Sequence, residues 1–358
     1  MIRTLLSDDL PRSRVLAALL VAIAAGLVVA PFVASGARAL NTAASICVFI
    51  VLAASYDLLI GYCGIVSFAH TMFYGIGAYG VGLAFGSMGP TWWALACGVS
   101  AALVLALLLA LAIGLLSLRV RALFFAMITL AVASVFGVLA SQLSDFTGGE
   151  DGRNFPVPEL LRPATRLVEG DVFGRALDGR LLTYYIVLAG SAALFLALLR
   201  VVNSHFGRVL LAIRENDFRA EALGYRTVVY RTLANCIAAL AATLAGALMA
   251  LWLRYVGPRT MLGFDVMADI LLIVVIGGMG RMYGAVIGAA LFLLAQNYLQ
   301  AAMGGLSGSL SALPWLARAA HPDRWMLWMG VLFIACVYYF PSGIVGKLRG
   351  APAARPAP

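Results

Sequence analysis

Long apolar stretches, separated by short segments that carry most of the charge, make up nearly the whole chain. The stretch from Leu58 to Leu118 contains no Asp, Glu, Lys or Arg, and His70 is its only imidazole. At about 1.5 Å per residue it would form a helix roughly three bilayer cores long, so it must fold back on itself within a membrane. The pattern therefore predicts an all-α, polytopic membrane protein.

Charge-poor segments long enough to cross a bilayer predict ten transmembrane helices. Their approximate ranges are 15–35, 39–60, 65–86, 92–117, 122–143, 181–202, 232–253, 264–280, 282–302 and 325–343. The third is rich in glycine, and the eighth is short and carries Asp269. The first follows Arg12 and Arg14 without a small-residue cleavage site, so we expect a retained span rather than a removed signal peptide. One transmembrane domain is expected over residues 1–358.

The basic residues favour one orientation of these spans. With the N-terminus in the cytoplasm, fifteen of the 25 basic residues lie on the inner side, and five of the ten outer ones lie in a single long loop, where they count less. An even number of spans returns Lys347 and Arg349 to the inner side. We therefore expect both termini in the cytoplasm, with a flexible tail over residues 347–358.

Composition supports a membrane protein and disfavours two other classes. Hydrophobic residues make up 63% of the chain and charged residues 11%, against about 25% charged in soluble domains. The net charge of +9 follows from arginines in short inner loops, so it does not indicate a nucleic-acid partner. The five cysteines form no CxxC pair and the three histidines are far apart, so we expect no metal site.

Two loops are longer than a connection requires. The outer one, 145–180, holds seven acidic and five basic residues and begins with the run Thr147, Gly148, Gly149, Glu150, Asp151. It is either a solvated surface loop or an external gate or docking surface. For the second role the candidates are Thr147, Gly148, Gly149 and Asp151.

The inner loop, 203–231, predicts a short amphipathic helix. Apolar and charged residues alternate at roughly helical spacing, and Gly224 is placed to end the helix in a left-handed turn. Such a helix can insert into a groove on a cytoplasmic partner. The alternative is a helix lying flat on lipid headgroups, which the acidic residues Glu215, Asp217 and Glu221 disfavour.

The run from Gly61 to Tyr79 combines glycines with hydrogen-bonding side chains. Tight helix packing and a polar translocation pathway both use such residues. The same choice applies to a second glycine-rich segment in the other half of the chain, and the pair suggests an internal repeat. The candidates for the pathway or for packing are Gly61, Gly64, Ser67, His70, Thr71, Tyr74, Gly75, Gly77, Gly277, Gly278 and Gly280.

The chain lacks the residues that ATP hydrolysis requires. A phosphate-binding loop of the GxxxxGK[ST] type needs a lysine followed by Ser or Thr, and the only lysine, Lys347, precedes Leu348. An ion-coupled carrier would use a carboxylate within the membrane, for which Asp57 and Asp269 are the candidates. Because both lie near the ends of their spans, they give only weak support to ion coupling.

Four segments resemble the second permease subunit of branched-chain amino acid ABC importers, to which urea and short-amide permeases are closely similar. Residues 61–79 match the pattern G-x-x-G-x-x-S-x-x-H-x-x-F-x-G-I-G-A-Y, and 214–224 resemble the cytoplasmic coupling loop. Residues 275–289 resemble the late glycine-rich segment, and 147–152 an outer-loop pattern. The chain departs from the family at Asp265, Asp269 and the stretch 304–324, which leaves the substrate open.

The resemblance implies a heteromeric importer in a bacterial inner membrane. A second permease subunit, two cytoplasmic ATP-binding subunits and a periplasmic substrate-binding protein would be its partners, with ATP and Mg bound by the ATPases and no cofactor in this chain. The residues expected to contact the ATPase are Arg214, Glu215, Asp217, Glu221, Ala222 and Gly224.

The absence of a fixed charge in the 61–79 run narrows the expected cargo. An unpaired charge is costly in so dry a site, whereas a zwitterion can be met by backbone dipoles and helix ends. We therefore expect a transport subunit, not an enzyme, for an aliphatic amino acid. A urea or short-amide permease is the alternative, followed by an ion-coupled transporter.

Overall fold

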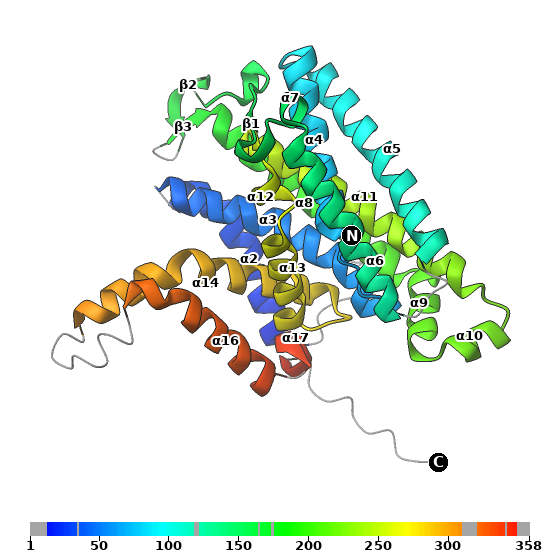
Figure 1. Cartoon of the computed structure of the whole chain (residues 1–358). Helices are drawn as coiled ribbons and strands as arrows, with labels where there is room; N and C mark the ends of the chain where they lie inside the picture. The colour runs from blue at the N-terminus through cyan, green and yellow to red at the C-terminus, as the bar shows by residue number, and fades with distance from the viewer. Residues whose placement is uncertain are drawn as a thin grey trace.

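The computed structural model describes residues 13–33, 36–117, 122–163, 165–172, 175–309, 321–340 and 342–348. Within them the protein is almost entirely helical (Figure 1). The first half contains α2 (Arg14–Val33), α3 (Ala37–Asp57), the π-helical segment η1 (Leu58–Cys63), α4 (His70–Met88), α5 (Trp92–Ser117) and α6 (Ala122–Gln142).

The second half repeats the alternation of long helices and short connections. The outer loop holds α7 (Ser144–Thr147), η2 (Gly149–Asp151), β1 (Arg153–Asn154), η3 (Glu159–Leu161), β2 (Arg166–Val172) and β3 (Arg175–Asp178). It is followed by α8 (Gly179–Asn203), α9 (His205–Glu215), α10 (Asp217–Ala222), α11 (Thr227–Leu253), β4 (Tyr255–Val256), α12 (Pro258–Met261), α13 (Phe264–Gly277), α14 (Met282–Ser309), η4 (Pro322–Arg324), α16 (Trp325–Tyr339) and α17 (Gly343–Leu348). Two antiparallel pairs, β1 with β4 and β2 with β3, form small two-stranded sheets.

Nine segments of the described chain are long and apolar enough to cross a membrane. They correspond to nine of the ten predicted spans; the other predicted span is α4, whose glycines and polar residues make it less apolar. Its predicted start was wrong, because residues 64–69 are not helical and the helix begins at His70. The predicted eighth span is α13, which has 14 residues and is only about 21 Å long.

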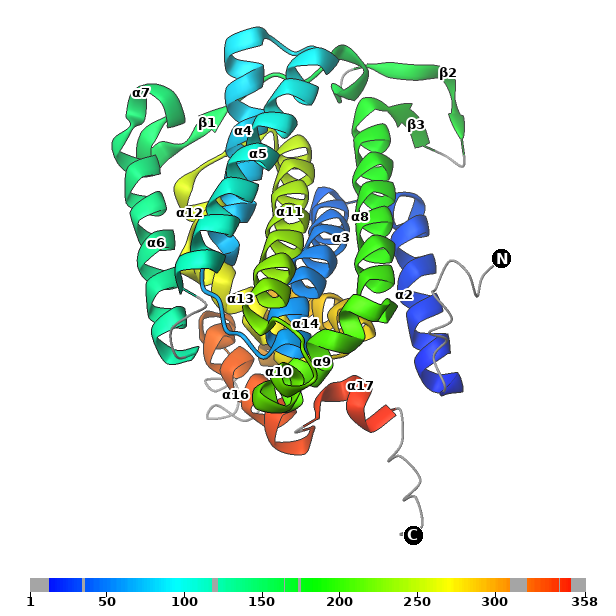
Figure 2. The same cartoon turned by 90° about the vertical axis from the view of Figure 1, so that its right-hand side faces the viewer.

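The two long loops lie at opposite ends of the helix bundle. Figure 2 shows α7 and the strands β1 to β3 at one end and α9 and α10 at the other. This arrangement agrees with the predicted topology. The tail 349–358 and seven arginines used in the topology argument lie outside the described residues, namely Arg3, Arg12, Arg119, Arg121, Arg318, Arg349 and Arg355.

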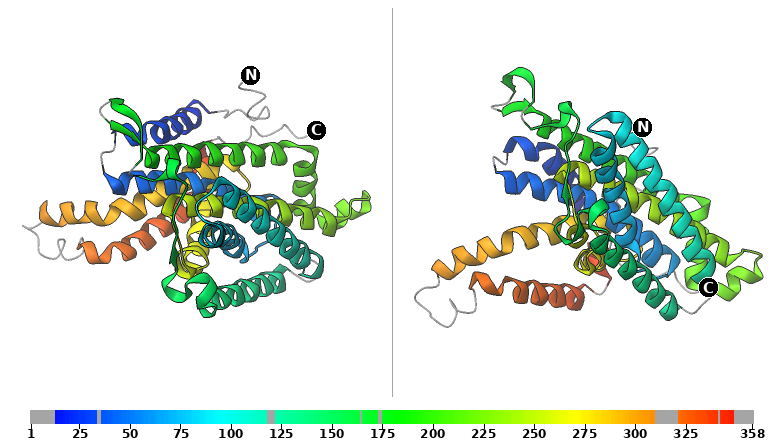
Figure 3. Two further views of the ribbon diagram at one scale, coloured as in Figure 1. Left: turned by 90° about the horizontal axis from the view of Figure 1, so that it is seen from above. Right: turned by 45° about the horizontal axis from the view of Figure 1, so that its top comes forward.

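The centre of the bundle is formed by α3 and α11. Of the residues in their most apolar stretches, 89% and 72% are buried. By contrast α2 and α6, at 11% and 17%, lie at opposite edges when the molecule is viewed from above (Figure 3). Glycine lets α4 approach α11 closely, since a Cβ at Gly77 would meet the backbone oxygen of Thr243, and one at Gly246 that of Tyr74. Small residues allow this approach between membrane helices.

A proline explains how α2 is fastened to the bundle. Pro31 has no N–H and cannot donate to the carbonyl of Leu27 one helical turn earlier. The Tyr184 hydroxyl of α8 donates to that oxygen instead, at 2.5 Å. The neighbouring Tyr185 hydroxyl donates to Val28 O at 3.0 Å. Two phenols thus hold the outer end of a helix that is otherwise largely exposed.

Candidate functional site

A buried carboxylate joins the two halves of the chain at the inner end of the bundle. Asp57, 1% exposed at the end of α3, accepts hydrogen bonds from Gly280 N at 2.7 Å and from Arg281 N at 3.0 Å. Beside it, the carbonyl of Gly61 accepts a hydrogen bond from the guanidinium of Arg214 on α9. We call Asp57, Gly61, Arg214, Gly280 and Arg281 the inner junction.

Glycine is required in the inner junction because backbones meet there. A Cβ at Gly61 would collide with the Asp57 carboxylate and the backbone nitrogen of Gly280. Gly280 and Gly278 have φ of +76° and +112°, which favour glycine. The two glycine-rich segments singled out in the sequence therefore meet in one packing contact, and Asp57 is satisfied by backbone donors.

The run that starts at Gly61 begins within a π-helix. Residues 58–63 continue α3 as a π-helix, and Gly64, with φ +73°, ends it. Single π-helical turns widen the backbone locally and often occur at functional sites. Here the widened turn brings the Gly61 carbonyl within reach of Arg214, so the end of a membrane helix is bonded to the inner loop.

The inner loop folds as two short helices instead of the single helix predicted. The helix is interrupted at Asn216. The side chain of this residue accepts a hydrogen bond from Arg219 N at 2.9 Å and caps α10. At the other end Gly224, with φ +90°, adopts the left-handed turn expected of it. Hydrogen bonds from Tyr225 N to Ala220 O and from Gly224 N to Glu221 O complete a Schellman motif.

Several residues expected to contact an ATPase have partners within the chain. Asp217 pairs with Arg231 at 2.9 Å, and the Glu221 carboxylate accepts a hydrogen bond from the Thr227 hydroxyl at 2.7 Å. Arg214 binds the Gly61 carbonyl. These contacts fix the shape of the loop and its place on the bundle. Glu215, Ala222 and Gly224 are exposed.

Two apolar side chains on α10 and its C-terminal turn were missed as candidates. Phe218 is 88% exposed and Leu223 is 72% exposed. Because exposed apolar surface can serve as a contact for another protein, these two side chains join the candidate residues of the inner loop. The available signal was the presence of these residues in a segment otherwise rich in charge.

The polar residues of the 61–79 run are buried. Ser67, His70, Thr71 and Tyr74 are each at most 2% exposed. His70 Nε2 lies 2.8 Å from Ser55 Oγ, and the Ser55 hydroxyl donates to Leu52 O at 2.9 Å. Since the serine proton is used in that bond, we assign the proton between Ser55 and His70 to the imidazole. His70 therefore has the environment of a packing histidine.

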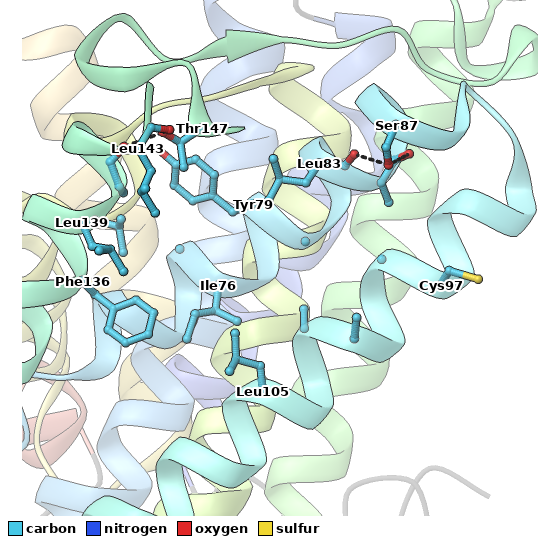
Figure 4. A pocket seen from close by; sticks show the side chains of 18 of the residues that line it. Ile76, Tyr79, Leu83, Ser87, Cys97, Leu105, Phe136, Leu139, Leu143 and Thr147 are labelled. Carbon is cyan, nitrogen blue, oxygen red and sulfur yellow. Dashed lines mark hydrogen bonds between the residues drawn. The ribbon is translucent and has the colours of Figure 1, made fainter. Parts of the chain in front are cut away.

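Two cavities flank α4 on either side of the contact between Gly75 and Leu262. The first, about 480 Å³, lies between α4, α5 and α6 and is lined mainly by apolar side chains such as Ile76, Leu105 and Phe136 (Figure 4). The second, about 440 Å³, lies between α4, α6 and α13. Thr71, Ser134, Ser141, Gln142 and Glu150 give it a more polar lining.

The proposed external gate is a compact turn at the outer end of α6. The Thr147 hydroxyl lies 2.6 Å from Ala140 O and accepts a hydrogen bond from Gly149 N at 3.2 Å. Gly148 and Gly149 have φ of +84° and +65°. The carbonyl of Asp151 accepts from the Tyr255 hydroxyl at 2.8 Å. The turn thus joins α6 to the segment that follows α11.

The remaining chemistry-bearing residues form no further cluster among the residues that the structure describes. No group of three or more His, Cys, Asp or Glu there could hold a metal ion. All five cysteines are free thiols. The second carboxylate considered for ion coupling, Asp269, accepts a hydrogen bond from Gln296 on α14 at 3.3 Å.

Comparison with known proteins supports the family resemblance that these segments indicated. The family model described as "Branched-chain amino acid transport system / permease component" matches residues 38–337. The chain belongs to this family. The matched region covers the inner junction, the inner loop and both cavities, whereas α2 lies outside it.

Individual relatives carry related names. The chain is 28% identical over 265 residues to the high-affinity branched-chain amino acid transport system permease protein LivM of Salmonella typhimurium, and 28% identical over 269 residues to LivM of Escherichia coli. Each match covers 71% of this chain and 61% of the relative, so the chain spans less than two-thirds of their length. A probable LivM permease of Methanocaldococcus jannaschii is 27% identical over 163 residues, 45% of each chain. No solved structure gives a significant match.

Proposed function

We propose that this chain is the membrane-spanning permease subunit of an ATP-driven importer of branched-chain or other aliphatic amino acids. The observation that carries the proposal is the α9–α10 pair, which exposes Phe218 and Leu223 while Arg214 bonds it to the inner junction. Membership of the permease family supports the same role.

The inner junction supplies a mechanical connection for such a role. An ATPase that binds Phe218 and Leu223 would move α9 and α10 as one body, because Ala220 of α10 packs against Val209 and Ile213 of α9. The hydrogen bond from Arg214 to the Gly61 carbonyl would transmit this displacement to η1. The hydrogen bond between Asp57 and Gly280 would transmit it to the turn before α14. Rigid-body movements of packed helices are a common means of alternating access.

The partners follow from this role. We infer a second permease subunit, two ATP-binding subunits on the cytoplasmic face and a periplasmic substrate-binding protein, in a bacterial inner membrane. ATP and Mg belong to the ATPase subunits, so the isolated chain neither binds nor hydrolyses ATP. The missing phosphate-binding lysine supports this division of labour.

Competition between substrates tests the proposal. Uptake of radiolabelled leucine by the assembled transporter is challenged with excess isoleucine, valine, urea and arginine. We expect isoleucine and valine to compete and arginine not to compete, because the polar run at 67–74 offers no fixed charge to pair with the arginine side chain. Inhibition by arginine but not by valine would defeat the aliphatic assignment, and inhibition by urea alone would favour a urea permease.

The energy source is tested by omitting the ATPase. Leucine uptake should then stop even with an imposed ion gradient. Gradient-driven uptake without ATPase would contradict the proposal and would make Asp269 the first residue to neutralise, since Asp57 already has two backbone donors.

A further inference from the structure

The cavity between α4, α6 and α13 has the size and lining of a site for one small molecule. Its volume of about 440 Å³ is within the range of small-ligand sites. Along α6 and α13 it is lined by apolar side chains, among them Leu130, Val138 and Met267. Toward the outer end of α6 it is lined by Ser141, Gln142 and, from the outer loop, Glu150. An aliphatic group and a polar group would each find a matching region.

The N-terminus of α13 adjoins this cavity. Figure 2 shows α12, just before it, beside α6 and well below the outer ends of α4 and α8, so α13 begins part-way along the length of the bundle. Gly263 precedes the helix and provides no side-chain cap. Phe264 and Met267 of the first turn line the cavity. The free N–H groups and the dipole of a helix N-terminus favour a carboxylate. The neighbouring Asp265 is exposed and does not line the cavity.

A second, independent observation comes from Thr71. This side chain is 2% exposed and lines the cavity from α4. Its hydroxyl has no hydrogen-bond partner within the part of the chain that the structure describes. Because Thr71 lines the cavity, its hydroxyl is free to donate to or accept from a group bound there.

The charge at the rim of the cavity is negative. Glu150 is the charged residue among those that line it within the described structure, and its side chain is exposed. A carboxylate in this position can accept a charge-assisted hydrogen bond from an ammonium group. The α13 N-terminus and Glu150 therefore present opposite charges to one ligand.

We propose that this cavity is a transient substrate site that receives a zwitterionic aliphatic amino acid. Its carboxylate lies against the α13 N-terminus and the Thr71 hydroxyl, its ammonium group faces Glu150, and its aliphatic side chain contacts Leu130, Val138 and Met267. This inference rests on the proposed function and assigns it a site.

Two substitutions in the assembled transporter test the site. Thr71→Val removes the hydroxyl at nearly constant volume, and Glu150→Gln removes the charge. Each should lower leucine uptake about tenfold while ATP hydrolysis stimulated by the binding protein is retained. The control is Thr243→Val: Thr243 is equally buried, at 1% exposed, but its hydroxyl donates to Ala239 O within its own helix. It should leave uptake unchanged.

Cysteine protection supplies a readout of occupancy. In a cysteine-free background, Ser141→Cys should react with a water-soluble thiol reagent, and leucine supplied during turnover should slow the reaction. Asn154→Cys, at an exposed position in the outer loop and outside the cavity lining, should react with the reagent but show no protection. The site alone would be overturned if the wild-type transporter takes up leucine, Thr71→Val and Glu150→Gln take it up equally well, and leucine does not protect Ser141→Cys. Absence of leucine uptake by the wild-type transporter would instead defeat the proposed function.

Discussion

The carboxylate of Asp57 accepts a hydrogen bond of 2.7 Å from the backbone N–H of Gly280, a residue 223 positions later in the chain. The contact ties the end of α3 to the turn before α14 at the inner end of the bundle. Asp57 therefore belongs to the inner junction, as Arg214 does. The contacts of this junction predict how its residues respond to substitution.

Replacing Asp57 should destabilise the subunit. Asp57→Ala removes the acceptor of two partly buried N–H groups, those of Gly280 and Arg281, which costs up to about 1–3 kcal/mol for each. Asp57→Asn retains one acceptor oxygen and should fall between wild type and Asp57→Ala. The melting temperature of the purified protein in detergent measures the effect. Equal stability of all three forms would show that this contact does not hold the two halves together.

Gly61→Ala should disrupt the same junction through its added methyl group. A Cβ there meets the Asp57 carboxylate and the Gly280 nitrogen, so helices must separate. The matched control is Gly330→Ala in α16, where nothing lies within 4 Å of an added Cβ and the change should be neutral or stabilise by about 0.5–1 kcal/mol. Similar thermal unfolding of the two variants would contradict the packing assignment.

Phe218→Glu should weaken binding of the ATPase while leaving the permease folded. Phe218 is 88% exposed, so its removal costs no internal packing, but a charge would oppose insertion into an apolar groove. Phe146→Glu is the control, because Phe146 is 68% exposed on the outer helix α7. Co-purification of the ATPase measures the effect. Loss of the ATPase from both variants would indicate general misfolding.

Gly224→Val should impair coupling by a different route. Its φ of +90° strains a β-branched residue, so the Schellman motif that ends α10 would be lost. Gly224→Asn, which tolerates left-handed backbone better, should retain more leucine uptake. The two uptake rates relative to wild type are the measurement, and a Val variant as active as the Asn variant would remove this turn from the mechanism.

Tyr184→Phe should loosen α2, because Leu27 O would lose the donor that replaces the missing N–H of Pro31. The expected cost is about 1–3 kcal/mol. Pro31→Ala restores a helical donor and should reduce the effect of Tyr184→Phe in the double variant. A double-mutant cycle of thermal stability measures this coupling, and additive effects would disprove the link between the two residues.

Single cysteines at Asn216 and Asn154, in a cysteine-free background, should be labelled from opposite sides of the membrane. Both positions are exposed, in the inner and outer loop respectively. Labelling with an impermeant thiol reagent in intact and inverted vesicles is the measurement. Modification of both from one side would contradict the single span predicted between them.

The sequence by itself determined the class, the approximate spans and the family. Apolar runs that lack charge have no alternative to membrane helices, because the backbone must satisfy its own hydrogen bonds in lipid. The end of α10 was also predictable, since Gly224 occupies a position that requires positive φ. These features depend on local composition, which a single sequence displays directly.

Only the tertiary structure decided what the polar and glycine residues contact. Gly61 and Gly280 are far apart in sequence, and nothing in either segment shows that Asp57 joins them. The exposure of Phe218 could not be read from a loop whose break at Asn216 was unknown. Equally, Thr71 lines a cavity while His70 beside it binds Ser55, because the direction of each side chain depends on which helices pack around α4.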